Sequence, residues 1–121
     1  MTFEITHWPR FLEIRHVGPT RYADRLAGLR AIAEFSRGQS ERKPVLINFV
    51  DADLVIEPEP EPDYMLQATT DPFFTGRSVA MIGITHEAAA PSIAAARIRG
   101  VELALFVARV DAVDWLRSKA A

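Results

Sequence analysis

A chain of 121 residues with 49% hydrophobic and 25% charged residues fits one domain with a single core, and this composition excludes wholesale disorder. The formal charge of −2 is too small to indicate nucleic-acid binding or a polybasic membrane contact. The lack of cysteine excludes disulfides and thiolate chemistry, and no segment has the length of a signal peptide core or a membrane span, so the expected location is the cytoplasm.

The first predicted elements are two antiparallel strands followed by a helix. The segments "FEIT" and "FLEIRHV" alternate apolar and polar residues, and a proline-containing turn over residues 7–10 joins them. We expect Gly18 and Pro19 to end the second strand, Thr20 to cap the helix, and Gly38 to stop it. The helix would turn inward an apolar stripe of Tyr22, Leu26, Leu29 and Ala33, and turn outward Arg21, Asp24, Arg25 and Arg30.

Three later segments are almost continuously apolar, which is typical of strands covered on both faces: residues 44–50, 78–85 and 101–108. An alanine-rich helix separates the last two, and we expect it to begin near Ala90 because Pro91 fits only the first turn. A last helix, capped by Asp111, ends the chain. The fold class predicted is α/β: a single domain over residues 1–121 with a mixed, mostly parallel five-stranded sheet, an N-terminal antiparallel hairpin and about four helices. The hairpin edge could pair in a homodimer.

Negative charge is concentrated after the third predicted strand. Residues 44–75 contain seven acidic and no basic side chains, and residues 57–62 are three consecutive Glu-Pro pairs. Each proline forces extended backbone on the preceding glutamate, so these carboxylates point in different directions and are poorly arranged to chelate one ion. We interpret residues 57–62 as a stiff, solvated spacer.

Four polar residues follow the carboxyl ends of two predicted parallel strands, where open sheets bind their ligands: Asp51, Asp53, Thr85 and His86. Two carboxylates and an imidazole could perform acid–base chemistry or hold a metal. Turn hydrogen bonds and helix capping explain each of these residues equally well. The favoured prediction therefore contains no catalytic residue, no metal and no cofactor.

A small-molecule pocket is a further candidate at the same end of the sheet. Its apolar lining would come from Tyr64, Met65, Leu66, Phe73 and Phe74. The glycines form no phosphate-binding loop and the serines no nucleophile elbow. These observations favour binding over catalysis.

The segments "FEITHWPRFLEIRHVGPT", "PVLINFVDADL", "RSVAMIGIT" and "GVELALFVARVDAVDWLRSKA", taken in order, resemble the SpoIIAA-like branch of the STAS (sulfate transporter and anti-sigma-factor antagonist) superfamily. The resemblance covers most of the chain and implies a compact α/β domain that works by binding. In anti-sigma-factor antagonists a serine or threonine that opens the helix after the third strand is phosphorylated. The corresponding stretch here, residues 49–65, contains neither residue, so a phosphorylation switch is not expected at this position.

Three functions follow as hypotheses. The first is a non-enzymatic regulatory or interaction domain whose acidic segment attracts a basic protein partner. The second is a domain that binds a small apolar or anionic ligand. The third is an acid–base enzyme that uses Asp51, Asp53 and His86. We favour the first.

Overall fold

The computed structural model describes residues 3–39, 41–55, 57 and 63–120. Its centre is a five-stranded sheet with the order β1-β2-β3-β4-β5. The two N-terminal strands pair antiparallel and every other neighbouring pair is parallel. The strands are β1 (Phe3–His7), β2 (Leu12–Thr20), β3 (Val45–Leu54), β4 (Ser78–Ile82) and β5 (Glu102–Phe106). The predicted fold class is confirmed.

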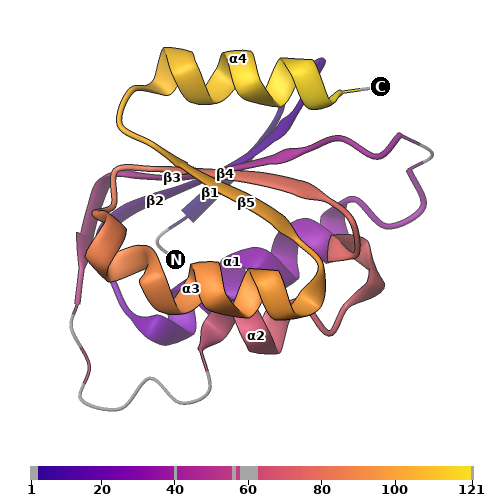
Figure 1. Cartoon of the computed structure of the whole chain (residues 1–121). Coiled ribbons are helices and arrows are strands. Elements are labelled where there is room, and N and C mark those ends of the chain that lie inside the picture. Colours follow the sequence, from indigo (N-terminus) through magenta and orange to yellow (C-terminus); the bar gives the residue numbers. More distant parts are fainter. Residues whose placement is uncertain (1–2, 40, 56, 58–62, 121) are drawn as a thin grey trace.

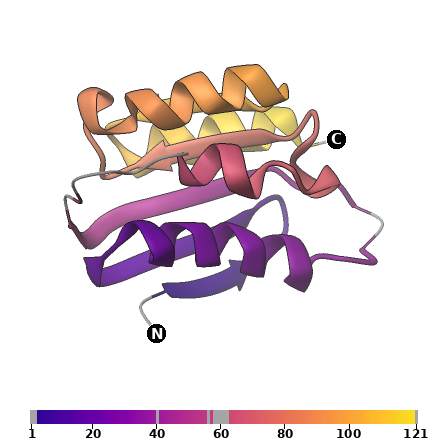
Figure 2. The ribbon, with the colours of Figure 1, turned by 90° about the horizontal axis from the view of Figure 1, so that it is seen from below.

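Helices cover the two faces of the sheet unequally (Figure 1). Three helices lie on one face, where the short α2 packs between the other two (Figure 2), and α4 alone lies on the opposite face. The helices are α1 (Tyr22–Phe35), α2 (Tyr64–Ala68), α3 (His86–Arg99) and α4 (Arg109–Lys119). A 3-10 turn, Pro72–Phe74, follows α2. No helix in the described part of the chain is long and apolar enough to cross a membrane.

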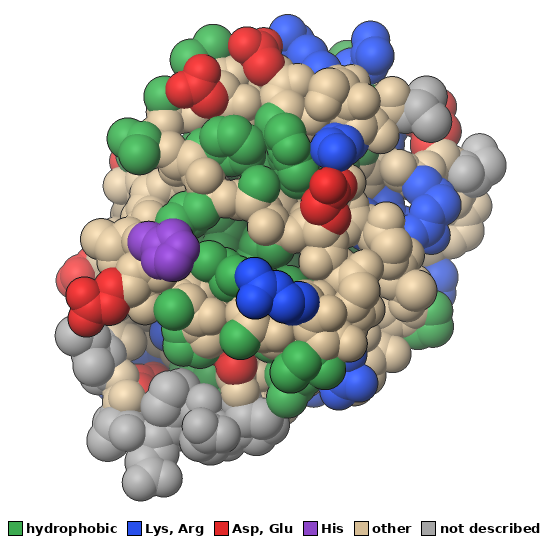
Figure 3. Space-filling view, in the orientation of Figure 1, with side chains coloured by type: hydrophobic (Ala, Val, Ile, Leu, Met, Phe, Trp, Pro, Cys, Tyr) green, Lys and Arg blue, Asp and Glu red, His purple; other side chains and the backbone are tan. Residues whose placement is uncertain are grey.

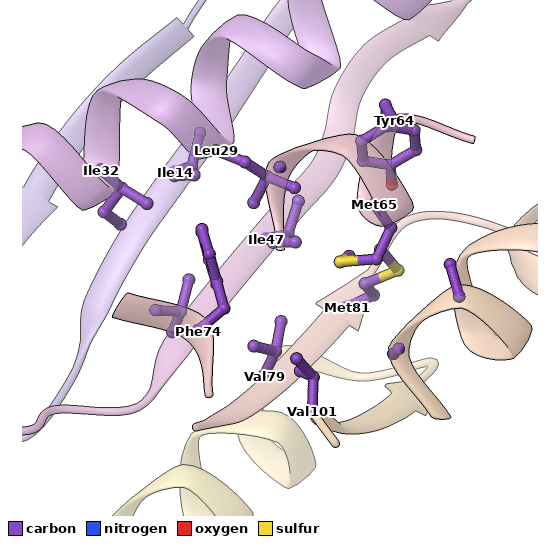
Figure 4. Close-up of a cluster of buried hydrophobic side chains, with 14 of the residues drawn as sticks. Ile14, Leu29, Ile32, Ile47, Tyr64, Met65, Phe74, Val79, Met81 and Val101 are labelled. Atoms are coloured by element: carbon purple, nitrogen blue, oxygen red, sulfur yellow. The ribbon is translucent and has the colours of Figure 1, made fainter. Parts of the chain in front are cut away.

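The main core lies between the sheet and the three helices α1, α2 and α3 (Figure 4). Apolar residues that alternate along β2, β3 and β4 point into it, and helix residues such as Leu29 and Ile32 meet them. A smaller core forms beneath α4, where Leu116 is fully buried against Leu46 and Ile82. β4 is buried on both faces, because it lies between the two cores. This explains why its sequence is continuously apolar.

The two edges of the sheet are β1 and β5. Each pairs with a single neighbour, so each has one unpaired side. Hydrophobic side chains are visible between α4 and α3, over β5, on the face in Figure 3. The homodimer expected through the hairpin edge stays a prediction.

A register shift between β2 and β3 decides where the acidic residues point. Arg15 pairs with Asn48, but Val17, two residues later, pairs with Asp51, three residues later. This bulge reverses the alternation of β3, so that Asp51 and Asp53 face the α4 side of the sheet while Ala52 and Leu54 pack against the main core.

The second strand is longer than expected. β2 continues through Gly18 and Pro19, which pair with Ala52 and Asp53. Proline is tolerated here because β1, from Phe3 on, pairs only as far as His16, so no strand among the described residues needs a donor on that side.

Three helix starts also differ from the expected ones. Thr20 donates its hydroxyl to the Gly18 carbonyl, and α1 begins after Arg21, whose N–H bonds the Asp24 carboxylate at 2.8 Å. α3 begins one turn before Ala90, because the Thr85 hydroxyl caps it by accepting the Ala88 N–H at 3.1 Å. Pro91 therefore lies inside the helix, on an exposed side where water can satisfy the carbonyl that loses its partner. α4 begins at Arg109, which places Asp111 in the first turn and not at the cap.

Candidate functional site at the carboxyl end of the sheet

A pocket of about 180 Å³ opens at the carboxyl end of the parallel strands, and we call it the rim pocket. It lies where the end of β3 meets the N-terminal part of α1, the segment that enters α2, and the first turns of α3. Its lining residues are Tyr22, Arg25, Leu54, Val55, Glu57, Asp63, Ala88 and Pro91. This is the position at which α/β sheets bind ligands, because the strands end there and loops diverge.

Arg25 and Tyr64 are the most unusual residues at the rim pocket. The Arg25 guanidinium carbon lies 5.1 Å from the centre of the Tyr64 ring, and the Tyr22 ring meets the Tyr64 ring edge-on at 5.8 Å. The Arg25 Nε is buried without a hydrogen-bond partner in the part of the chain that the structure describes, and the Tyr64 hydroxyl is buried beside the Arg25 and Ser92 side chains. Burial raises the pKa of Tyr64 to about 12, so this phenol stays protonated at neutral pH. The sequence pattern placed Arg25 on the outer face of α1, and this prediction is wrong.

Asp63 is the N-cap of α2, the helix that follows β3. Its carboxylate accepts the Met65 backbone N–H at 2.8 Å and the Ser92 hydroxyl at 3.3 Å. A single side chain thus caps α2 and connects it to α3.

The two aspartates predicted as site residues lie on β3 and are exposed. Asp51 accepts two hydrogen bonds from Arg15, at 3.1 Å from Nε and 2.8 Å from Nη2. Arg15 also contacts Glu4 at 3.0 Å, so three charged side chains form a surface row across β1, β2 and β3. Asp53 makes no ion pair within the described residues.

Thr85 and His86 lie at the start of α3. Thr85 is its N-cap, as the capping interpretation held, and His86 is exposed. α3 covers the face of the sheet opposite to the one that Asp51 faces, so the structure does not bring Asp51 and His86 together. No group of three histidine or acidic side chains among the described residues could hold a metal ion.

The aromatic residues of the predicted ligand pocket are parts of the core. Tyr64, Met65 and Phe74 are at most 1% exposed and belong to the main core (Figure 4). The Phe73 ring is only partly buried, stands edge-on to that of Phe74 at 4.8 Å, and carries the Arg77 guanidinium at 3.6 Å. A ligand-binding role for Tyr64, Phe73 and Phe74 stays a prediction.

Sequence reasoning missed two members of the rim pocket, Arg25 and Asp63. Arg25 follows the polar spacing of α1, and only the packing of α2 against α1 encloses it. The sequence could have indicated that Asp63 begins a helix, because an aspartate just before an apolar segment is a usual helix N-cap.

No protein-family model and no curated protein sequence matches the chain. Several solved structures are similar to it, and two of them are described. One is an uncharacterised protein of the DUF3478 family with a SpoIIAA-like fold from Shewanella loihica PV-4. Its sequence is 21% identical, the match covers 94% of this chain and 91% of that chain, and the TM-score is 0.59. The other is the anti-sigma factor antagonist SpoIIAA in its unphosphorylated form, with 12% identity, 95% and 97% covered, and a TM-score of 0.58. The chain therefore has a SpoIIAA-like fold.

Proposed function

We propose that this chain is a non-enzymatic interaction domain that binds a basic surface of a protein partner through its acidic rim, defined as residues 51–63. The observation that carries the proposal is the exposed carboxylate of Asp53, which no cation neutralises within the described residues, on a domain with a SpoIIAA-like fold. A similar structure is that of an anti-sigma factor antagonist, which gives a precedent for this fold in a regulatory protein.

The charge around Asp53 supports a role in recognition. Asp51 is only half compensated, since Arg15 divides its donors between Asp51 and Glu4. Glu57 meets Arg21 at 3.5 Å, and the Arg21 side chain is 67% exposed, so this pair contributes little to stability. Asp51 and Asp53 are exposed and Glu57 is partly exposed, and carboxylates that are so weakly paired add little to folding and are available to attract a positively charged surface.

Recognition at this rim would not depend on phosphorylation. Asp63 opens α2 with a carboxylate that is already committed to the Met65 N–H and the Ser92 hydroxyl. Its carboxylate belongs to the side chain and does not have to be added by a kinase, so the domain would bind its partner constitutively. Control of binding would then have to act through the amount of either protein.

The test is capture of a partner from extracts of the source cells by the immobilised chain. The Asp53→Lys/Glu57→Lys double variant should lose the captured protein, since it reverses two charges on the rim. The matched control is Asp111→Lys/Asp114→Lys, which makes the same change of charge at exposed positions of α4 and should retain capture. Wild-type capture should weaken as salt is raised, because the screening length falls from about 8 Å at 0.15 M to about 3 Å at 1 M.

Thermal unfolding of both double variants must accompany the capture experiment. We expect melting temperatures close to that of the wild type, because exposed ion pairs contribute at most about 1 kcal/mol. Undiminished capture by a folded Asp53→Lys/Glu57→Lys protein would rule out the acidic rim as the binding surface.

One observation favours a second function, the binding of a small anion in the rim pocket. The buried Nε of Arg25 has no hydrogen-bond partner within the described residues, and a buried donor without a partner costs about 1–3 kcal/mol. An anionic group on a ligand would satisfy it. Native mass spectrometry of protein purified from cells should show a co-purifying mass that an Arg25→Met variant lacks, whereas a bare polypeptide mass for the wild type would count against this function.

A further inference from the structure

A second pocket lies between the β1–β2 turn and α4, at the opposite end of β2 from the rim pocket. We call it the hairpin pocket. It encloses about 270 Å³, which is close to the lower limit for small-molecule sites. Its lining residues are Trp8, Pro9, Arg10, Phe11, Arg109, Val113 and Arg117. The hairpin and the last helix, from opposite ends of the chain, therefore form its two walls.

A buried carboxylate holds these walls together. Glu13 is 4% exposed, and its two oxygens accept hydrogen bonds from Arg109 at 2.6 and 2.8 Å. The Trp8 indole N–H donates to the same carboxylate at 2.9 Å, and Asn48 donates to it at 3.0 Å. Burial opposes ionisation of Glu13, but the hydrogen bonds from Arg109, Asn48 and Trp8 outweigh it and hold the pKa of this carboxyl below its ordinary value. Glu13 is therefore an anion that fixes one side chain of each wall.

The turn that carries Trp8 is also fixed through its backbone. The Trp8 N–H donates to the Phe11 carbonyl at 2.9 Å, and the Lys43 ammonium donates to the Trp8 carbonyl at 3.2 Å. Even so, Trp8 is 41% exposed. An exposed aromatic ring that is already held in one position loses little conformational entropy when a ligand covers it.

The charge left over at the hairpin pocket is positive. Glu13 compensates Arg109, but the side chains of Arg10 and Arg117 are exposed and make no hydrogen bond or ion pair with the residues that the structure describes. Asp114, three residues before Arg117 on α4, makes no ion pair with it. Two free guanidinium groups thus stand beside an apolar surface.

We propose that the hairpin pocket binds a small organic anion with a flat apolar body. Arg10 and Arg117 would bind its acidic group, since guanidinium matches carboxylate and sulfonate oxygens well. The exposed Trp8 ring, with Phe11 and Val113, would pack against its body. This site lies at the start of β2, whereas Asp51 and Asp53 of the acidic rim pair with the end of β2, so it adds a ligand to the domain and does not depend on the partner proposed above.

Titration of the full-length, 15N-labelled chain with 1-naphthoate tests the site, with two-dimensional NMR as the readout. We expect saturable shifts of the Trp8 indole N–H and of amides in α4. Trp115, whose ring packs on Phe106 outside the pocket, is the internal reference and its indole signal should move less. Two matched probes separate the contributions: 1-naphthalenemethanol has the same body without the charge, and acetate has the charge without the body. Each should bind about tenfold or more weakly than 1-naphthoate.

Charge-removing variants test the role of the two arginines. Arg10→Gln/Arg117→Gln should weaken 1-naphthoate binding about tenfold or more. The matched control is Arg30→Gln/Arg97→Gln, which removes two exposed arginines from α1 and α3 and should change the affinity less than about twofold. Both pairs lie at the surface, so both proteins should fold.

Three results would overturn the proposal. The first is a folded wild-type protein with no saturable shift at the Trp8 indole. The second is equal binding of 1-naphthoate and its neutral analogue, which would leave the arginines without a role. The third is tighter binding of the acidic peptide VIEPEPEPD, the sequence of residues 55–63, at the same amides, because this would make the pocket a docking site for a protein segment.

Discussion

Replacement of His16 by leucine should remove a large part of the acid sensitivity of the fold. His16 lies on β2, is 1% exposed, and stacks on Phe49 with ring centres 5.2 Å apart. Its Nδ1 is buried without a hydrogen-bond partner in the described part of the chain. Burial lowers the pKa of His16 to about 4, and the nearby Asp24 opposes this shift while Arg25 adds to it. The folded protein therefore keeps this imidazole neutral over a range in which the unfolded chain protonates it.

The size of the effect follows from the two pKa values. The unfolded chain takes up a proton near pH 6.5, and the folded protein takes it up only near pH 4. Protonation between these values favours unfolding, so stability is lost as the pH falls through this window. His16 should cost about 2 kcal/mol of unfolding free energy between pH 7 and 5, and about 3 kcal/mol by pH 4.

The assay is urea unfolding, followed by circular dichroism, of the wild type and the His16→Leu variant from pH 7 to 4. Carboxylates titrate in both proteins, so the quantity to compare is the difference in unfolding free energy between them at each pH. That difference should shift in favour of the variant by about 2 kcal/mol at pH 5. His86→Leu removes an exposed histidine and should follow the wild type. A wild-type-minus-His16→Leu difference that stays constant from pH 7 to 4 would refute the reasoning.

Two further substitutions test the packing. Gly83 has a φ of 79°, and a Cβ there would lie against the backbone nitrogen of Val50, so Gly83→Ala should lower the unfolding free energy by about 3 kcal/mol or more. Its control is Gly38→Ala, with a φ of 89° and open space around it, which should lower the unfolding free energy by about 1 kcal/mol. Equal urea midpoints for the two variants would show that β3 moves to make room for the added methyl group. Arg77 is 7% exposed, lies over the Phe73 ring and donates from Nε to the Phe73 carbonyl at 2.7 Å. Because lysine cannot reproduce these contacts, Arg77→Lys should lower the unfolding free energy by about 2 kcal/mol. An unchanged thermal midpoint would contradict this role of the guanidinium group.

Most of the fold prediction came from the local spacing of hydrophobic residues along the chain. Alternation predicted the inward positions of Ile5 and Ile14, and the continuous apolar segments predicted the strands β3, β4 and β5. β4 is buried on both faces as expected, but β5 is an edge strand and is only partly buried. Element boundaries were less accurate, because they depend on individual hydrogen bonds. Thr20 and Asp111 both have side chains that can cap a helix, but neighbouring residues decide where α1 and α4 begin.

The candidate sites were harder to predict than the fold. Asp51 and His86 were expected to share one crevice, but they lie on opposite faces of the sheet. A bulge in β3, which no sequence motif indicates, turns Asp51 to the α4 side. The rim pocket does lie at the predicted end of the sheet, but Arg25, a partly buried residue whose Nε is fully enclosed, comes from the polar spacing of α1. A charged residue on the outer face of an isolated helix becomes buried only when another element packs over it.

The sequence alone determined which segments become strands and helices and the order in which they alternate, since hydrophobic spacing and turn residues act over a few neighbouring positions. Only the tertiary structure decided which side chains meet. Glu13 and Arg109 are 96 residues apart in the chain and form the contact that joins the hairpin to α4. Such a pair leaves no local pattern, because its energy depends on the burial and geometry that the whole fold creates.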